Sequence, residues 1–560
     1  MRIIKQSGGL KVQAIAGTYV ISLGMDLPES ECDGFLGFSI HRTDHTSGKA
    51  MFLNGMKAFA ETDPGFPAGS EYSSEQHPIQ SFQWADYSVQ PDHRYTYRVL
   101  ARKGTPQVLT TYAEVVFNIT SENPETGEHA IYFNRGVAAS QEYARRFGDR
   151  APEKVAPGKG YLENPAFVWL SRGLYEAMTH FIESADPDHD SFRIAAYEFT
   201  FSPFLDTLKR AIDRGVDIQI IYDGRENSDG VPGQTNRNAV MAAGLTPFSV
   251  ERTRPKSVIS HNKFIVRLHD GKPVSVWTGG TNFSKGGIFG HSNAAHLIKI
   301  PEVASKYLEY WSVLKNDPEH APLTQAVESI TPLPDSSLPG KGTTAIFSPR
   351  TTLESLDLYA GYAMKARQGL MMTFAFGMND IFKKVYQTSN APFRLALMEQ
   401  KTRPMKESPE KKTEEESIQK LRNMPQNVFA IGNFIRTNSI DGWVKERLSG
   451  LNANVRYVHD KFMLIDPLGN DPIVIAGSAN FSAASILKND ENMVVVRGDK
   501  RVADIYLGEF MRLWSHHAFR ESLQWRRPGD PPVKPLRTDD WWRDSFGNTE
   551  RSARRQFFAP

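Results

Sequence analysis

The sequence predicts an α/β protein with two pseudo-symmetric α/β lobes and an N-terminal β-sandwich-like domain. The first observation is a duplication, because residues 260–284 and 458–482 carry His, Lys, Gly, Asn and Phe residues at the same spacing. The second is that strand-like apolar runs alternate with amphipathic helical runs between residues 161 and 520. The third is that the first 132 residues alternate apolar and polar side chains between Gly and Pro, which favours antiparallel strands.

The size and composition of the chain limit its class. With 560 residues it is too long for one hydrophobic core. Its 40% hydrophobic and 23% charged residues are typical of a globular protein, and a net charge of +2 is less basic than a dedicated nucleic-acid binder usually is. No apolar run reaches the roughly 18 residues of a membrane span. Gly, Lys and Gln interrupt the N-terminal apolar stretch, so we expect no signal peptide.

The cysteine content indicates the compartment. A single cysteine, Cys32, excludes an intrachain disulfide and a multi-cysteine zinc site. Because it lies beside Pro28, Asp33 and Gly34, we interpret it as a loop thiol rather than a nucleophile. These features predict a cytoplasmic protein.

The predicted units follow one another along the chain. Each half is expected to contain a mostly parallel sheet and to end in an equivalent packing helix. The candidate elements are 192–199, 202–215 and 216–223 in the first half, 369–376, 378–388 and 393–399 in the second, and the terminal helices 302–315 and 501–514. The predicted boundaries are 1–132 for the sandwich, 133–160 for a linking helix, 161–340 and 341–520 for the lobes, and 521–560 for an irregular tail. A charged insertion at 401–424 is interpreted as a solvated surface or, alternatively, a lid.

The repeated segments carry the chemistry. His261 and His459 are 198 residues apart, and the pairs Lys263 and Lys461, Gly279 and Gly477, and Asn282 and Asn480 keep this offset. Strand alternation places His459 and Lys461 on one face. Lysine charges, asparagine amides and small residues that admit an anion together form a suitable cradle for a phosphoryl group. We therefore predict that Gly279, Gly280, Gly477 and Ser478 bind the substrate. Because no cluster of carboxylates or cysteines adjoins the motifs, we expect no metal and no other cofactor.

Together with Asp466, the second segment forms H-x-K-x4-D followed by G-S-x-N, and the first forms H-x-K-x4-L followed by G-G-x-N. These elements resemble those of the phospholipase D superfamily over roughly residues 160–520. The resemblance implies two phospholipase D-like lobes with one shared active site. It also implies a ping-pong reaction through a phosphohistidine, with water or an alcohol as the second acceptor. In the family the motif Asp is structural, which is the role expected for Asp466; Leu268 takes its place in the first half.

The two halves also differ at one later position. Eleven residues after Asn480 stands Glu491, and eleven after Asn282 stands Asn293. In the family an acidic residue near this place orients the histidine. We therefore expect Glu491 to raise the pKa of His459, and neutral Asn293 to orient His261. This predicts His261 as the nucleophile and His459 as the general acid.

Other polar residues are weaker candidates. His269 and Asp270 are interpreted as hairpin-turn residues, whereas His291 and His296 are close enough in sequence to Asn293 to line the cleft. Asp223, Arg225 and Glu226 end a predicted strand, where α/β proteins often place ligands.

The substrate is open at this point. A phospholipid-directed phosphodiesterase with peripheral membrane contact is favoured by aromatic residues near the C-terminus, Trp541, Trp542, Phe557 and Phe558. A nuclease is the alternative, with a basic strip of Arg526, Arg527, Arg551, Arg554 and Arg555. A third possibility is a non-catalytic binding protein, against which the intact His, Lys and Asn of both halves argue. Because both half-sites are in one chain, a monomer is expected to be active.

Overall fold

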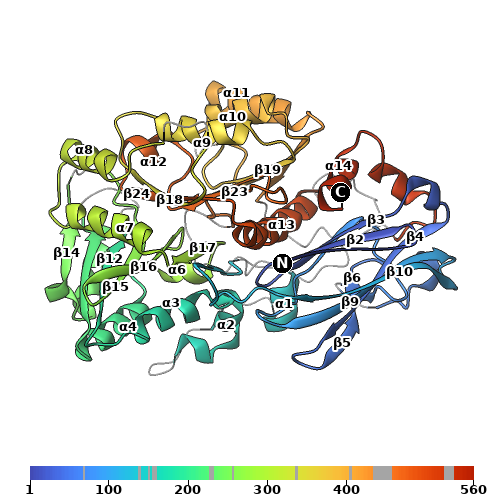
Figure 1. The fold of residues 1–560 in the computed structure, drawn as a ribbon, viewed down its shortest axis with the longest axis horizontal. Helices are drawn as coiled ribbons and strands as arrows, with labels where there is room; N and C mark the ends of the chain where they lie inside the picture. Colours follow the sequence, from blue (N-terminus) through green and yellow to red (C-terminus); the bar gives the residue numbers. More distant parts are fainter. Residues whose placement is uncertain are drawn as a thin grey trace.

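The computed structural model describes most of the chain. The described residues are 1–66, 70–136, 141–148, 152–153, 155, 160–225, 232–254, 258–334, 338–402, 406–432, 457–522 and 535–559. The first lobe, the second lobe and the N-terminal domain lie at the left, top and right of Figure 1.

Two seven-stranded sheets with the same strand order form the two lobes. The first sheet has the order β11 (His129–Phe133), β17 (Ala294–Ile298), β16 (Lys272–Gly279), β15 (Lys263–His269), β12 (Asp190–Ala196), β13 (Asp217–Asp223) and β14 (Ser249–Arg252). The second has the order β18 (Gly342–Ser348), β24 (Glu491–Arg497), β23 (Ile473–Gly477), β22 (Phe462–Ile465), β19 (Gly369–Phe374), β20 (Phe393–Met398) and β21 (Asn427–Ile431). This match confirms the predicted pair of pseudo-symmetric α/β lobes.

The prediction of mostly parallel sheets was wrong. Parallel pairing is confined to β12–β13–β14 and the equivalent β19–β20–β21, and the other neighbours are antiparallel. The reason is the repeated motif itself, since each copy folds into a hairpin whose short connection permits only antiparallel strands. In the first copy the turn is Asp270–Gly271, where both residues have positive φ, as a two-residue hairpin turn requires.

Helices cover both faces of each sheet. The first lobe contains α2 (Pro165–Ser171), α3 (Leu174–Glu183), α4 (Ser202–Asp213), α5 (Gly233–Ala242), α6 (Lys285–Phe289), α7 (Pro301–Leu314) and α8 (His320–Ile330). The second contains α9 (Glu354–Met364), α10 (Asp380–Thr388), α11 (Pro409–Arg422), α12 (Ala483–Leu487) and α13 (Lys500–Ser522). Short 3-10 helices are η1 (Glu29–Glu31), η2 (Ala60–Thr62), η3 (Tyr161–Glu163), η4 (Thr246–Phe248) and η7 (Trp541–Ser545). The charged segment 401–424 thus contains α11, whose Ile418 and Leu421 are buried.

The equivalent helices α7 and α13 hold the lobes together. Tyr307 and Tyr310 of α7 pack against Phe264 of the first sheet and also against Phe347 of β18. In the mirrored contact, α13 packs on β22 and reaches Phe133 of β11. The equivalence predicted for 302–315 and 501–514 is therefore confirmed, and each helix belongs to the core of both lobes.

The first lobe replaces the missing motif Asp by another carboxylate. Asp466 accepts hydrogen bonds from the backbone amides of residues 367–369, at 2.7–3.0 Å, and so holds the corner before β19. Leu268 at the equivalent position is buried. The corresponding corner is held by Asp190, which accepts from Arg267 Nη2 at 2.6 Å and contacts His269 Nδ1 at 3.0 Å.

The N-terminal domain consists of two four-stranded antiparallel sheets that share one core. Their strands are β1 (Arg2–Ser7), β2 (Leu10–Ala16), β3 (Ile21–Asp26) and β8 (Gln83–Asp86), and β10 (Leu109–Thr120), β9 (Arg94–Gly104), β4 (Phe35–Asp44) and β5 (Lys49–Phe52). A small pair, β6 (Asn54–Gly55) and β7 (Tyr72–Ser73), lies beside them. Cys32 follows η1 and is buried in this core, which raises its pKa to about 12. The next strand along the chain, β11, already belongs to the first lobe's sheet, and α1 (Gln141–Phe147) follows it.

The aromatic residues of the C-terminal segment are buried, which corrects the expectation of an irregular surface tail. Trp541 and Trp542 belong to the core of the N-terminal sandwich, and Trp541 Nε1 donates to Phe35 O at 2.8 Å. Phe557 and Phe558, on α14 (Glu550–Phe558), belong to the core between α13 and the second sheet. In Figure 1, α14 lies between the sandwich and α13. Among the described residues, no helix combines the length and hydropathy of a membrane span.

The described arginines of the predicted basic strip lie beside carboxylates and do not form a continuous basic surface. Arg554 and Arg555 pair with Glu550 and Asp26, and Arg551 lies 3.7 Å from Asp544. Arg526 and Arg527 lie outside the described residues.

Candidate active site

The two histidines of the repeat meet because the lobes exchange backbone contacts symmetrically. The segment before His261 pairs with the segment before β24, through a Ser260–Asp490 bridge. The segment before His459 pairs with the segment before β17, through a Ser292–Val458 bridge. Both bridges are related by the same 198-residue offset as the histidines, so a pseudo-twofold axis passes between His261 and His459. The side chains of both histidines are buried.

Each histidine is oriented by the other lobe, and the predicted partners were exchanged. His261 Nδ1 lies 2.8 Å from Glu491 Oε2, and His459 Nδ1 lies 2.9 Å from Asn293 Oδ1. Glu491 therefore orients His261, and Asn293 orients His459. The Ser260–Asp490 bridge places the start of β24 opposite His261, and the Ser292–Val458 bridge places the start of β17 opposite His459. A carboxylate only accepts hydrogen bonds, and the Asn293 Nδ2 group already donates to Gly287 O at 2.7 Å. Both imidazoles thus carry hydrogen on Nδ1 and leave Nε2 for a substrate.

The two lobes also differ at the residue that lies beside Glu491 or Asn293. Ser478, on the turn after β23, donates from Oγ to Glu491 Oε2 at 2.7 Å. Its equivalent in the first lobe is Gly280, and an ideal Cβ there would lie 3.2 Å from Asn293 Oδ1. The carboxylate thus has a hydroxyl donor, while the smaller glycine leaves room for the carboxamide.

Lys263 and Lys461 bring positive charge to the same place. Both are buried, and each Nζ donates to the carbonyl oxygen of the histidine two residues earlier, at 2.5 and 2.6 Å. Burial lowers the pKa of Lys263 to about 8, and burial together with repulsion from Lys263 lowers the pKa of Lys461 to about 7. A bound anion would stabilise their charged forms.

Burial also lowers the pKa of both histidines. Glu491 opposes the effect at His261, whose pKa is about 4. The pKa of His459 lies well below its ordinary value, because burial is reinforced by Lys461, His291, Lys263 and His261. Without a bound anion both rings are neutral at pH 7, and a bound phosphodiester would raise the proton affinity of each.

Asn282 and Asn480 follow the glycine positions of the two hairpins. Their Oδ1 atoms have no hydrogen-bond partner among the described residues, and Asn282 is buried. With the two histidines and two lysines, they complete a set of six side chains in which each lobe supplies one His, one Lys and one Asn. The arrangement offers positive charge, amide donors and two imidazoles to one phosphoryl group.

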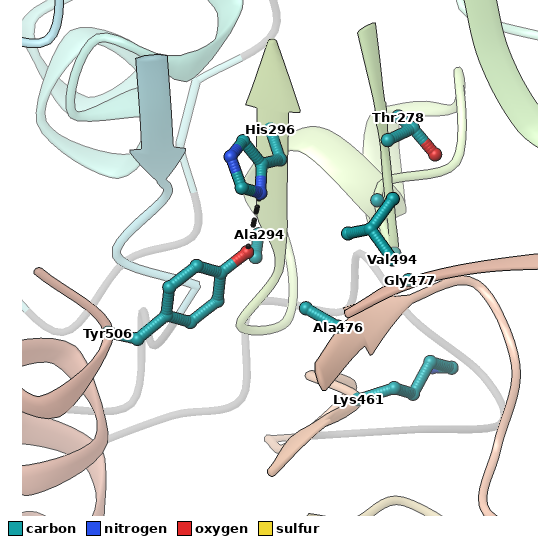
Figure 2. Close-up of a pocket in the computed structure, with 10 residues that line it drawn as sticks. Thr278, Ala294, His296, Lys461, Ala476, Gly477, Val494 and Tyr506 are labelled. Carbon is teal, nitrogen blue, oxygen red and sulfur yellow. Dashed lines mark hydrogen bonds between the residues drawn. The ribbon is translucent and has the colours of Figure 1, made fainter. Parts of the chain in front are cut away.

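Close backbone contacts explain why glycine occupies positions 279 and 477, which were predicted to bind the anion. A Cβ on Gly279, which has a φ of 137°, would lie 2.4 Å from Ala294 O, and one on Gly477 would lie 2.2 Å from Asn492 O. Close strand packing therefore requires both glycines. They border a small cavity between the lobes, which Lys461, His296 and Tyr506 also line (Figure 2).

The other sequence candidates separate into three groups. His291 packs against His459, with ring centroids 4.4 Å apart. His296 lines the cavity of Figure 2, where its Nδ1 lies 3.3 Å from the Tyr506 hydroxyl and its Nε2 lies 2.8 Å from His129 Nδ1. His269 and Asp270 lie at the hairpin end of β15, the opposite end from His261, and Asp270 pairs with His189.

Asp223 supports the histidine segment, and sequence reasoning missed its counterpart. Asp223 Oδ2 accepts from Ser260 N at 3.2 Å and pairs with Arg225, while Glu226 lies outside the described residues. Glu399, which follows β20, accepts from Tyr457 N and Val458 N at 3.2 and 2.8 Å. The shared position of these carboxylates after equivalent parallel strands was visible in the sequence once the repeat was aligned. In the described part of the chain, no three His, Cys, Asp or Glu side chains form a group that could hold a metal ion.

Comparisons with known proteins identify the family of the two lobes. A family model described as "Cardiolipin synthase, PLD-like domain" matches residues 178–314 and 365–514, just over half of the chain. A search of curated protein sequences returned no match.

Solved structures with a related fold include three bacterial proteins. Phosphatidylserine synthase of Haemophilus influenzae Rd KW20 is 11% identical, with 62% of this chain and 87% of that chain covered and a TM-score of 0.44. Nuc of Salmonella typhimurium, a phospholipase D family member, is 30% identical over 26% of this chain and 87% of its own, with a TM-score of 0.21. Polyphosphate kinase of Porphyromonas gingivalis is 11% identical over 71% of this chain, with a TM-score of 0.40, and this chain spans 54% of its length.

Proposed function

The chain belongs to the phospholipase D-like family, and we propose that it is a metal-independent phosphodiesterase that forms a phosphohistidine intermediate. The observation that carries the proposal is the pairing of His261 with Glu491 and of His459 with Asn293 across one buried site. Two imidazoles with different partners suit two different roles in the cleavage of one phosphodiester.

Binding of the phosphodiester begins the reaction. The anion lies between Lys263 and Lys461, whose ammonium groups neutralise its charge, and the amides of Asn282 and Asn480 donate to its oxygens. The bound negative charge raises the proton affinity of His459, which takes up the proton that it later donates. The site is thus charged for catalysis only when it is occupied.

The nucleophile in this proposal is His261. The reason that the sequence offered for this assignment, a pKa of His459 raised by Glu491, is wrong because Glu491 contacts His261. The assignment rests instead on the charge of the intermediate. Its Nε2 forms a bond to phosphorus, the bond from phosphorus to the leaving oxygen breaks, and His459 Nε2 gives its proton to that oxygen. The phosphorylated imidazole is positively charged for the whole life of the intermediate, so it benefits most from the carboxylate of Glu491. Asn293 is neutral, so it orients His459 without raising the pKa of the imidazolium that must release its proton.

Hydrolysis reverses the roles. A water oxygen attacks phosphorus, His459 takes the water proton, and the bond between phosphorus and His261 Nε2 breaks. The products are a phosphomonoester and free His261, with His459 protonated as it was in the enzyme–substrate complex. An alcohol in place of water would give a new phosphodiester and hence headgroup transfer.

For the substrate we propose a phospholipid, whose headgroup is hydrolysed or exchanged. The support is the description of the matching family model as a cardiolipin synthase domain. The buried Trp541, Trp542, Phe557 and Phe558 do not provide a membrane-binding surface, so any peripheral membrane contact must use other residues. A single chain holds both half-sites, and we propose that the monomer is active.

A parallel assay tests reaction and substrate together. The full chain is incubated in excess EDTA with phosphatidylcholine vesicles, single-stranded DNA, duplex DNA and RNA, with the His459→Ala variant as control. The proposal predicts EDTA-resistant release of choline by the wild type and its loss in the variant. Cleavage of nucleic acid alone would establish the nuclease alternative, and an activity abolished by EDTA would contradict the mechanism.

A further inference from the structure

The ring of His291 lies against the ring of His459, with centroids 4.4 Å apart and planes tilted by 38°. Both side chains are buried, at 7% and 6% exposure. His291 belongs to the loop between α6 and β17, two residues before Asn293, which orients the same ring. A third imidazole is therefore in contact with the candidate acid, although the motif does not include it.

The backbone that carries His291 is firmly held. Asn134 Nδ2 donates to His291 O at 2.9 Å, and Asn134 Oδ1 accepts from Asn293 N at 2.8 Å. Ser292 N donates to Tyr457 O at 2.9 Å, which ties the loop to the segment before His459. Residues 291–293 thus form a clamp that fixes the ring, the backbone and the Nδ1 partner of His459.

The equivalent clamp in the other lobe has no imidazole. Residues 489–491 hold His261 through the Glu491 carboxylate and the Asp490 carbonyl, but the residue in the place of His291 is Asn489. The face of His261 is covered instead by Tyr197, at 4.8 Å between ring centroids. The pairing of two imidazoles is thus confined to the histidine whose Nδ1 partner is neutral.

The groups that act most strongly on the pKa of His459 are cationic when protonated. Lys461, Lys263, His261 and His291 all disfavour its protonation, and the carboxylate of Glu491 is engaged by His261 and Ser478. Asp460, the next residue, is buried, and its pKa is raised to about 7, so it supplies no fixed negative charge. At this separation two protonated rings would repel each other strongly enough to move a titration by roughly two pH units, so the pair titrates as a unit.

We propose that His291 is a positioning residue for the acid, and that it forms with His459 an imidazole pair that holds a single proton. The pair keeps that proton beside the leaving oxygen while preventing His459 from holding it too tightly to release. This role rests on the proposed function of His459 as the general acid. The ring contact is present without substrate, where the pair takes up its single proton below pH 7.

Titration of the histidine rings by NMR tests the pairing in the full-length chain. In the wild type, His459 is expected to titrate in two steps, because its proton is shared. In His291→Phe, which keeps an aromatic ring of similar size, it should titrate in one step with a midpoint at least about one pH unit higher. His291→Asn, which places the residue of the other clamp at this position, should give the same result. The matched control is His180→Asn, which removes an exposed histidine from α3 and should leave the His459 curve unchanged.

A single-step His459 titration with the same midpoint in wild type and both His291 variants would overturn the proposal. With a phosphodiester substrate, the alkaline limb of kcat/KM should move upward in His291→Phe by the same amount as the NMR midpoint. If the wild type cleaves no phosphodiester, the proposed function fails, while the NMR curves still decide whether the imidazoles share a proton.

Discussion

Replacing Glu491 by Gln removes the charge that faces His261 and keeps a group of the same shape. The Glu491 Oε2 atom lies 2.8 Å from His261 Nδ1 in a fully buried setting, so little solvent screens the interaction. The Gln amide oxygen still accepts a hydrogen bond, but the phosphorylated, positive imidazole loses its counter-charge. A hydrogen bond to a charged group is worth about 1 kcal/mol more than a neutral one, which corresponds to a loss of about 5-fold in the rate of phosphohistidine formation.

The leaving group distinguishes a defect in the nucleophile from a defect in the acid. Pre-steady-state bursts are measured with a p-nitrophenyl phosphodiester, whose leaving group needs no proton, and with an alkyl phosphodiester, whose leaving group does. Glu491→Gln should slow both substrates by the same factor. His459→Ala is the matched control and should be partly rescued by the p-nitrophenyl substrate. If Glu491→Gln is rescued in the same way, then His261 is the acid, and the assignment of roles is refuted.

Three further predictions concern the support of the site. Asp466→Ala removes the acceptor of three backbone amides and should lower the free energy of unfolding by about 2–4 kcal/mol in urea titrations. An unchanged unfolding midpoint would show that these hydrogen bonds do not stabilise the corner before β19. Gly477→Ala places a Cβ 2.2 Å from Asn492 O and should destabilise by about 1–3 kcal/mol, whereas Gly361→Ala, in open space on α9, should be neutral or stabilising. Burial raises the pKa of Asp223 to about 6, above its unfolded value, so the stability of the wild type relative to Asp223→Asn should fall as pH rises from about 4 to about 6; a constant difference would contradict this.

Local patterns in the sequence predicted the architecture well. The two-lobed fold followed from the duplicated hairpins, and the strands at 216–223 and 393–399 followed from apolar runs that end at polar residues. Strand direction was wrongly predicted because the rule for alternating strands and helices was applied to each whole sheet, although a hairpin turn was predicted within the motif. The burial of Trp541 and Phe558 was also missed, since composition does not tell a surface aromatic residue from one that fills a neighbouring domain.

The sequence predicted which residues form the candidate site, but it did not predict which of them contact one another. Glu491 and Asn293 have the same spacing from the motif asparagines, which showed that they occupy equivalent positions. Equivalent positions can orient the histidine of their own lobe or the histidine of the other lobe, and the spacing does not distinguish the two arrangements. The cross-lobe choice depends on the Ser260–Asp490 bridge, which pairs residues with no sequence relationship. One signal was available: Ser478 replaces Gly280 in the same half that has the carboxylate, as expected if the hydroxyl serves it.

Isolation of the covalent intermediate tests the central claim most directly. The full chain is mixed with a slowly hydrolysed phosphodiester, quenched under alkaline conditions that preserve phosphohistidine, digested and mapped by mass spectrometry. The account predicts a phosphoryl group on His261, and its accumulation in His459→Ala with a p-nitrophenyl leaving group. A phosphoryl group on His459, or turnover without any phosphorylated histidine, would contradict it.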